Sequence, residues 1–512
     1  MPNNKSKRDS IESILKRYNK AIARKDLYRD MYESAYAIAL PQRNLYSNQS
    51  EGSKKMQNVY DSTGMISVNG FANNMQNSLT PPFKRWVELK AGPAIPKEQR
   101  NEINEVLESV TEIAFEILNS SNFNTAVSEF YYDLAVGTGV LLVLPGNDYQ
   151  PINFVCVPIA QIALDDGPFG TVGCVYRTHE MSKRLMEQTW PDAKIQTLSD
   201  EDLDSKHKIV EASYQSETGT TFYDVILQAT SERIVEREFS YNPWIVTRIA
   251  KIAGEVFGRG PLIQASPDLQ MLNKVKELSL MHAQLNAFGI YTVADSDILN
   301  VDNITLNPGM FIPVSRNAGP NGPSIAPLPR AGDVNLQQFM VQELQTNIRQ
   351  MLLDNKLPPD TGPVRSATEI MARIKQIKQI TGPFFGRLMF EFVQPLWQAI
   401  ISILLEKNLI SLPPELSKID SFFVRVKVLS PIAQEQALED VENTVNAMQI
   451  VQSLGGEQAL MMAYKMEDFG EWIGNKLGTP NVLIRSEEER KQIMMQAQQA
   501  QQAQLEQQQP QQ

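Results

Sequence analysis

The segment Gly258-Arg259-Gly260-Pro261 is the part of the chain that most resembles a phosphate-binding loop, because closely spaced glycines precede a helical pattern. Such loops hold phosphate through free backbone N–H groups at the start of a helix. In the dinucleotide motif a third glycine would fall at position 263, which is Ile263. Pro261 also lacks the N–H that a phosphate would need. The segment therefore predicts a tight turn before a helix, and no nucleotide site is expected.

A second glycine pair, Gly137-Thr138-Gly139, is followed by Val-Leu-Leu where a P-loop would have Gly-Lys-Ser or Gly-Lys-Thr. No Walker A sequence occurs elsewhere in the chain, which argues against an ATP-driven motor. The Gly-x-Ser-x-Gly motif of serine nucleophiles is also missing. The sequence therefore gives poor support for an enzyme.

Residues that could bind a metal are scattered. The chain has no Cys-x-x-Cys pair and three widely separated histidines: His179, His207 and His282. Zinc sites need clustered ligands, so each histidine is expected at the surface or in packing. Asp165-Asp166 resembles the acidic pair of a nuclease, but the following Gly167-Pro168 favours a turn. No metal or cofactor is expected.

Basic residues gather at places that could face DNA or another subunit. The segment 82–86 joins Lys84 and Arg85 to aromatic residues, and a second group lies on a predicted helix: Arg373, Lys375 and Lys378. Isoleucines occupy the other side of that helix, which favours an ordinary solvated face, with a DNA- or subunit-facing surface as the alternative. Lys356 and Arg365, in or beside a proline-rich loop, leave the same two interpretations open.

The bulk composition fits a folded protein with more than one packed region. The chain has 512 residues, of which 42% are hydrophobic and 21% charged, and a formal net charge of −11. This acidic balance excludes a broadly basic nucleic-acid coat, so contact with DNA would be local or passive. Two cysteines cannot form a disulfide framework. The polar residues 1–18 and the lack of a long apolar run predict neither a signal peptide nor a membrane span.

The spacing of apolar residues predicts a helical N-terminal part and a β-rich middle. Pro41 ends the first helical region. Helices are expected at 10–40, 60–79, 97–118 and 182–192. Strands are expected at 139–145, 153–158, 173–180, 209–215, 221–229 and 232–238.

The second half predicts two long helices on either side of a small module. Ser266 and Pro267 form an N-cap and N1 pair, so the first helix is expected to begin there and run for about 20 residues. Its apolar stripe is Met271, Val275, Leu278, Met281 and Leu285. Residues 288–333 contain strand-like pieces with many prolines, and a helix of similar length follows at 335–354. The two helices suggest struts that hold the module away from the main body.

The rest of the chain is predicted to return to helices. A proline-rich loop leads to a helix at 367–406, which Gly382-Pro383 would kink. A strand at 422–428 precedes a helix at 432–453 that ends at Gly455-Gly456. Residues 491–512 are rich in glutamine and cannot build a globular core.

Seven segments then appear in a fixed order: YDSTG (60–64), SLTPPFKRW (78–86), GTGVLLV (137–143), GRGP before PDLQMLN (258–273), RSATEI (365–370), GPFFGRL (382–388) and VLSPIAQEQ (428–436). Each is modest alone, but together they cover nearly the whole chain. In this respect the chain resembles the portal proteins, or head-to-tail connectors, of short-tailed T7-like bacteriophages. The resemblance implies an α+β, mainly helical fold with a wing, a two-helix stem, a clip and a helical crown, assembled as a ring.

The resemblance also divides the chain into regions. They are the wing (1–265), a stem helix (266–287), the clip (288–334), a second stem helix (335–354), a tunnel loop facing DNA (355–366), a wing part with the kinked helix (367–430), the crown (431–484) and the glutamine-rich tail (485–512). This division coincides with the struts and module that the periodicity alone predicts. Lys356 and Arg365 would then be contacts of the tunnel loop with DNA.

Gly258, Arg259, Gly260 and Pro261 would form the junction between wing and stem. The two glycines are expected to allow a sharp change of chain direction. Arg259 is expected to pair with a carboxylate of its own or of a neighbouring subunit. Replacing Arg259 with Ala should then weaken ring assembly more than folding of the subunit.

The function implied by the resemblance is that of a passive conduit. Twelve subunits would form a ring at one capsid vertex, through which double-stranded DNA is packaged and later ejected. The implied partners are terminase, tail adaptor and nozzle proteins, capsid and scaffolding proteins, in a virion assembled in the host cytoplasm. Because phosphate contacts supply non-specific affinity and would obstruct sliding, a mostly acidic channel is expected. Another virion structural protein (a scaffold or capsid subunit) and a DNA-packaging enzyme are the alternatives.

Overall fold

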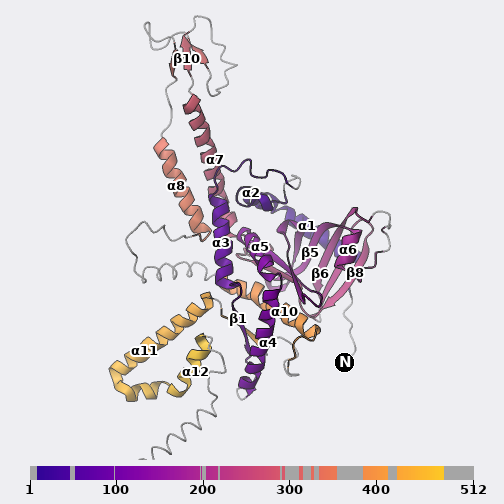
Figure 1. Ribbon diagram of the computed structural model, residues 1–512, viewed down its shortest axis with the longest axis vertical. Helices are drawn as coiled ribbons and strands as arrows, with labels where there is room; N and C mark the ends of the chain where they lie inside the picture. Colours follow the sequence, from indigo (N-terminus) through magenta and orange to yellow (C-terminus); the bar gives the residue numbers. More distant parts are fainter. Residues whose placement is uncertain are drawn as a thin grey trace, which may run out of the picture.

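The computed structural model describes residues 8–46, 52–96, 99–195, 198, 203–216, 219–288, 291–294, 311–314, 325–327, 334–354, 384–412, 424–429 and 431–477. These residues form a body of mixed helix and strand, from which helices project in two directions (Figure 1). The predicted combination of helices and strands is confirmed. The tunnel loop, with Lys356 and Arg365, and the glutamine-rich tail lie outside the described residues.

Helices make up the N-terminal part of the body. They are α1 (Ile11–Asp26), α2 (Arg29–Ala39), α3 (Thr63–Leu79), α4 (Arg100–Ser120) and α5 (Phe123–Val136). The predicted helical region 10–40 is thus two helices, because the chain turns at Leu27 and Tyr28 without a glycine or proline. Ser10 caps α1 by accepting a hydrogen bond from the N–H of Ser13 at 3.3 Å. The sequence pattern did not predict α5, which is apolar on several faces.

A five-stranded antiparallel sheet forms the outer part of the body, in the order β4-β5-β6-β7-β8. Its strands are β4 (Ile162–Asp166), β5 (Val172–Ser182), β6 (Lys206–Gln215), β7 (Thr221–Leu227) and β8 (Glu232–Phe239), with α6 (Lys183–Thr189) between β5 and β6. Side chains alternate between its two faces. Tyr223 and Val225 face the main core, while Phe222 and Ile226 face α1. Both faces are therefore covered, which explains why every residue of β7 is buried.

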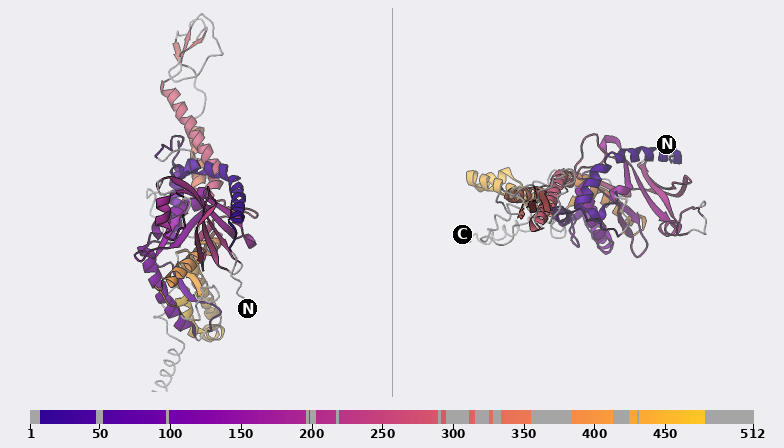
Figure 2. Two further views of the ribbon diagram at one scale, coloured as in Figure 1. Left: turned by 90° about the vertical axis from the view of Figure 1, so that its right-hand side faces the viewer. Right: turned by 90° about the horizontal axis from the view of Figure 1, so that it is seen from above.

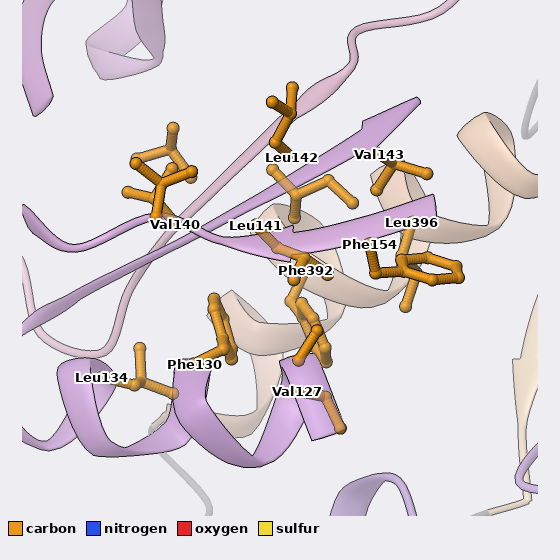
Figure 3. Packing of buried hydrophobic residues seen from close by; sticks show 14 of the residues in the cluster. Val127, Phe130, Leu134, Val140, Leu141, Leu142, Val143, Phe154, Phe392 and Leu396 are labelled. Carbon is orange, nitrogen blue, oxygen red and sulfur yellow. The ribbon is translucent and has the colours of Figure 1, made fainter. Parts of the chain in front are cut away.

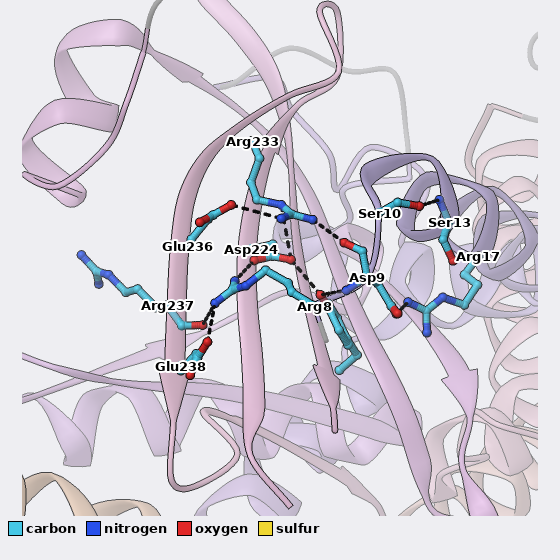
Figure 4. A network of polar contacts seen from close by, with 11 residues as sticks. Arg8, Asp9, Ser10, Ser13, Arg17, Asp224, Arg233, Glu236, Arg237 and Glu238 are labelled. Carbon is cyan, nitrogen blue, oxygen red and sulfur yellow. Dashed lines mark hydrogen bonds and ion pairs between the residues drawn. The ribbon is translucent and has the colours of Figure 1, made fainter. Parts of the chain in front are cut away.

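The covering of the outer face depends on polar contacts as well as apolar ones. Figure 4 shows Arg8, just before α1, paired with the buried Asp224 of β7 and with Glu238 of β8. Arg233 of β8 donates a hydrogen bond to the carbonyl of Asp9 at 2.6 Å. Burial raises the pKa of Asp224, although Arg233 and Arg8 partly offset this. The N-terminal segment is thus clamped to the sheet before α1 begins.

A three-stranded sheet lies at the centre of the body in the order β3-β2-β9: β2 (Thr138–Pro145), β3 (Ile152–Cys156) and β9 (Trp244–Arg248). Figure 3 shows how α5 packs across β2 with a helix from the second half of the chain. Phe130 of α5 stacks on Phe392 with ring centroids 4.8 Å apart. Elements distant in sequence therefore share one main core.

The helix from the second half runs over Phe384–Glu406 and includes a π turn (Met389–Val393) followed by α10 (Gln394–Glu406). The predicted kink at Gly382-Pro383 lies outside the described residues. In the described part of the chain, this is the one helix long and apolar enough to cross a membrane. Its side chains at Leu396, Trp397 and Ile400 are fully buried in the main core. Beside it, β13 (Val424–Val428) pairs antiparallel with β1 (Val87–Ala91).

The first projection consists of two helices and a small sheet, as the periodicity predicted (Figures 1 and 2). Its elements are α7 (Pro261–Phe288), α8 (Val334–Met351) and the strands β10 (Tyr291–Ala294), β11 (Phe311–Val314) and β12 (Ile325–Pro327). The strand β10 pairs in parallel with β11 and antiparallel with β12. The second projection consists of α11 (Pro431–Ala463) and α12 (Met466–Leu477). The backbone of Gly456 is non-helical, with φ 73°, so the predicted break at Gly455-Gly456 is confirmed.

Candidate functional site

The segment 258–260 forms the joint between the body and α7, where it crosses the turn that links α5 to β2. The N–H of Gly260 donates to the carbonyl of Val136 at 2.8 Å, and the N–H of Ile249 donates to that of Gly137 at 3.1 Å. The N–H of Arg259 donates to the carbonyl of Ala250 at 2.9 Å. Two backbone segments far apart in sequence are therefore bonded directly to each other.

The glycines are required because the two backbones touch. A Cβ atom on Gly258 would lie 2.2 Å from the carbonyl oxygen of Gly137, and one on Gly260 would lie 2.3 Å from that of Ala135. In return, a Cβ on Gly137 would lie 2.3 Å from the oxygen of Gly258. Gly137 has φ 153°, whereas Gly258 and Gly260 have no positive φ. The predicted reason, a sharp change of direction, is therefore wrong, and close backbone contact replaces it.

Buried side chains complete the hydrogen bonding of this crossing. The N–H of Gly258 donates to Oγ1 of Thr138 at 2.8 Å. The Tyr32 hydroxyl donates to the carbonyl of Gly258 at 3.1 Å, and burial raises the pKa of that hydroxyl. Because the N–H groups of all three residues 258–260 are used, none is left for a phosphate. The exclusion of a nucleotide loop thus has a structural reason.

Arg259 pairs with a carboxylate of its own chain. Its Nη2 and Nε atoms lie 2.7 and 2.8 Å from the two carboxylate oxygens of Glu255. A hydrogen bond from the guanidinium to Glu255 raises the pKa of Arg259. The pair is partly exposed, so solvent screening keeps its contribution to stability small. Of the two partners that the sequence left open, the structure contains the intrachain one.

Pro261 is the first residue of α7, so this helix begins before the predicted Ser266. The carbonyl of Gly260 accepts hydrogen bonds from the N–H groups of Ile263 and Gln264 at 3.1 and 3.2 Å, which makes Gly260 the N-cap. Gly260-Pro261 is as good a helix start as Ser266-Pro267. Pro267 lies inside the helix and is tolerated there at the loss of one backbone hydrogen bond. With 28 residues, α7 is about 42 Å long.

Both projecting helices are also anchored on α3 and the segment before it. The side chain of Asn273 on α7 accepts from the N–H of Tyr60 at 2.7 Å and donates to the carbonyl of Asn58 at 2.9 Å. From α8, the amide of Gln345 donates to Asp61 at 3.0 Å. A Cβ on Gly64 would lie 2.8 Å from Leu269 of α7. The motif YDSTG (60–64) thus holds the base of the projection, a role that its quoted letters alone did not reveal.

The predicted chemical sites are absent where the structure can show them. Among the described residues, no group of three or more His, Cys, Asp or Glu could hold a metal ion. Asp165 and Asp166 face Arg24, at 3.6 and 2.6 Å, at a bulge between β4 and β5. His179 is largely buried on β5, and burial with the nearby Arg177 lowers its pKa to about 3. A nuclease-like acidic pair is therefore neutralised by an arginine.

The basic cluster at 82–86 is mostly occupied by contacts within the body. Trp86 is buried and packs edge-on against Phe115 and Trp397. Arg85 lies 3.7 Å from both Glu108 and Glu112 of α4. The other basic cluster, Arg373, Lys375 and Lys378, lies outside the described residues. In the described part, the cluster at 82–86 therefore lacks the free charge that a DNA contact would need, apart from exposed Lys84.

The apolar stripe predicted for the first long helix is largely uncovered. Met271, Leu278 and Met281 of α7 are each about half exposed, at 52, 48 and 48%. Val341, Leu344 and Ile348 of α8 are buried on the side that faces α7. On the opposite side Phe339 is 65% exposed. The projection thus closes one face within the chain and leaves an apolar face open.

A family model described as bacteriophage head to tail connecting protein matches residues 12–484, which is most of the chain. The chain belongs to this family. Similar curated proteins are the probable portal protein of Bordetella phage BPP-1, 23% identical over 436 residues (79% of this chain, 75% of that protein), and the portal protein of Salmonella phage epsilon15, 24% identical over 428 residues (77% and 74%). The portal protein of Escherichia phage T7 is 19% identical over 459 residues (86% and 83%).

Among solved structures, the neck of an empty gene transfer agent particle is similar with a TM-score of 0.33 and 11% identity, covering 77% of this chain and 88% of that one. The virion of the native gene transfer agent particle gives 0.34 and 11%, with coverages of 85% and 96%. These scores are too low to carry an argument. The family and the curated relatives confirm the portal interpretation, including its T7-like character. This connector family is structural, so the prediction of a non-enzymatic protein is confirmed with it.

Proposed function

We propose that copies of this chain, twelve in number, form a closed ring at one vertex of a bacteriophage capsid, with double-stranded DNA passing through the central hole. Membership of the head-to-tail connecting family supports a portal function. The ring, the number of copies and the channel go beyond it. In this proposal the protein is a virion component assembled in the host cytoplasm.

The observation that carries the proposal is the uncovered apolar face of the projecting helices. Met271, Leu278 and Met281 follow one another along α7, and Phe339 lies on α8. Each square ångström of apolar surface removed from water contributes about 25 cal/mol, so an open stripe favours association. A contact between unlike faces of identical chains, repeated around an axis, closes into a ring. Neighbouring pairs of α7 and α8 would then form the wall of the channel.

The regions follow the predicted order with one change. The body is the wing, α7 and α8 are the stem, the strands β10–β12 belong to the clip, and α11 with α12 forms the crown. The stem begins at Pro261 in place of position 266. The tunnel loop at 355–366 would present Lys356 and Arg365 to DNA, and the glutamine-rich tail would extend from the crown.

The proposed conduit is passive. Terminase would drive DNA inward, and tail adaptor and nozzle proteins would later bind the clip, with capsid and scaffolding proteins around the wing. The side of α8 turned away from α7 supports weak contact with DNA, because its exposed charged residues are one acid and one base, Glu343 and Arg349. Few phosphate contacts would let DNA slide. The mostly acidic channel remains a prediction.

Negative-stain electron microscopy of the purified chain tests the proposal. Rings with a central hole are expected, whereas rods or shells would refute it. Changing Met271, Leu278 and Met281 together to Gln should abolish rings while leaving the chain folded by circular dichroism. Leu27→Gln, at an 82% exposed position of the body, is the matched control and should leave rings intact. An ATPase or nuclease activity of the pure protein would instead favour a packaging enzyme.

A further inference from the structure

A groove of about 340 Å³ separates β9 from β13 in the body. The Phe384–Glu406 helix forms its floor with Phe390, Gln394 and Gln398, and Val246 and Val426 belong to the strands on either side. The sheet topology pairs β9 only with β2, and β13 only with β1. Two strand edges therefore face one groove, and neither has a partner strand there.

The outer edge of β9 has one unused position at its centre. In an antiparallel pair, alternate residues point their N–H and C=O groups toward the partner. The bonds from Val143 to Pro243 and from Ile249 to Gly137 show that Ile245 and Thr247 face β2. Arg248 and Trp244, which point outward, donate their N–H groups to the side chains of Glu391 and Asn242. Between them Val246, only 9% exposed, has no hydrogen-bond partner among the described residues.

The outer edge of β13 is open in the same way. The N–H of Leu429 donates to the carbonyl of Trp86 at 2.8 Å, so the register turns Lys427 and Arg425 toward β1. Val424 and Val426 then point their backbone groups away from β1. The indole N–H of Trp244, which lines the groove, is also buried without an acceptor. Buried donors left without partners cost free energy, so the groove lacks an element that would satisfy them.

We propose that residues 481–485 of the same chain, Asn-Val-Leu-Ile-Arg, enter this groove as a strand between β9 and β13. The run is β-branched and apolar, begins just after Pro480 and contains no proline, as a buried strand requires. Adding a strand to an exposed edge is a common way of binding an extended segment. The insertion would join the three-stranded and two-stranded sheets into one, in the order β3-β2-β9, the new strand, β13-β1.

The end of the described chain lies in the right place to supply this strand. Helix α12 ends at Leu477, and the charge of its Lys476 contributes to the lowered pKa of Lys427 on β13, for which burial is the main cause. Both views in Figure 2 and the view in Figure 1 also show α12 close to β13. Five residues of extended chain span about 17 Å. A segment four residues beyond Leu477 can therefore reach a strand beside which α12 ends.

The proposal concerns the folding of each chain and does not rest on the ring. It gives the glutamine-rich tail a fixed starting point, because residue 485 would be held in the body. Residues 486–512 would then leave from the edge of the groove and not from the tip of the second projection.

Hydrogen exchange of the full-length protein, resolved by fragmentation mass spectrometry, tests the assignment. The amides of Val246 and Val426 should be protected, and Ile484→Asp should speed their exchange about tenfold or more. The amides of Ile245 and Thr247, which are bonded to β2, are internal controls and should not change. Ile493→Asp makes the same chemical change beyond the segment and should have no effect.

Two results would overturn the proposal. One is fast exchange at Val246 and Val426 in the unmodified protein, or protection that Ile484→Asp leaves intact. The other is protection that disappears on dilution to single chains, because the strand would then come from a second copy. Imaging of Ile484→Asp for rings is a separate measurement, so failure of this proposal and failure of the ring can be distinguished.

Discussion

The body and the two projections differ in how completely one chain buries its own apolar residues. In the body, large side chains such as Trp244, Trp397 and Tyr131 are fully buried in a shared core. In α11 and α12, Met448 is the one hydrophobic side chain that is buried among those described, while Leu454 and Met462 are 84 and 90% exposed. Helices are stabilised in proteins mainly by packing of their apolar faces. The body is therefore built to fold alone, and the projections are built to be completed by other surfaces.

The comparison can be broken most strongly inside the body. Glu391 on the π turn accepts hydrogen bonds from the backbone N–H of Arg248 at 2.9 Å and from its guanidinium at 2.7 and 3.2 Å. Glu391→Ala would leave the buried guanidinium of Arg248 without its charge partner, and we expect a loss of about 3–5 kcal/mol in the free energy of unfolding. Urea unfolding followed by circular dichroism measures it. A loss below about 1 kcal/mol would mean that water reaches Arg248.

The glycine crossing should show the next largest effect. Gly258→Ala places a methyl group 2.2 Å from a carbonyl oxygen, so we expect destabilisation by about 3 kcal/mol in urea unfolding. Gly386→Ala is the matched control, because its Cβ would meet no atom within 4 Å and its site is helical. That variant should be neutral or gain up to about 1 kcal/mol. Equal stability of the two variants would show that the crossing can open as a hinge.

Acid should weaken the body through His179. Its pKa is about 3 in the folded chain and about 6.5 when unfolded, so below pH 6.5 the unfolded chain binds the extra proton. Stability is therefore lost as the pH falls from 6.5 toward 3, by about 2 kcal/mol at pH 5. Comparing urea unfolding of the unmodified protein and His179→Gln at pH 7 and pH 5 isolates this contribution. The prediction fails if the two proteins lose the same stability.

The smallest effect on folding is expected at the joint's exposed surface. Arg259→Ala removes a screened pair with Glu255 and should cost less than about 1 kcal/mol in unfolding, while lowering the yield of rings. Arg29→Ala removes a comparable exposed pair with Glu33 in the body and serves as the control. Normal ring yield from Arg259→Ala would place this arginine outside the contact between copies.

Periodicity in the sequence predicted the projections better than the body. α8 and the break at Gly456 follow from regular apolar spacing and from glycine. In the body, α5 was missed because its buried residues, such as Phe130, Tyr131 and Leu134, cover adjacent faces and leave no amphipathic stripe. The short strands β1, β4 and β9 were missed for a similar reason, since five residues show too little alternation.

The joint itself could be located from the sequence but not explained. Both glycine motifs, at 137–139 and 258–260, were recognised separately, and each alone suggested a turn. Their meaning lies in the contact between them, which spans more than a hundred positions and depends on the register of β2 with β9. No local pattern encodes such a contact. The start of α7 was misplaced because two proline-containing helix starts occur close together and only the backbone bonds distinguish them.

The crossing of Gly137, Gly258 and Gly260 has a geometric consequence for any assembly of identical copies. The tilt of α7 is determined by peptide groups in direct contact, whose dimensions do not depend on the choice of side chain or rotamer. Every copy therefore presents its long helix at the same inclination, and small errors do not accumulate from one copy to the next. The backbone at this point works as a gauge.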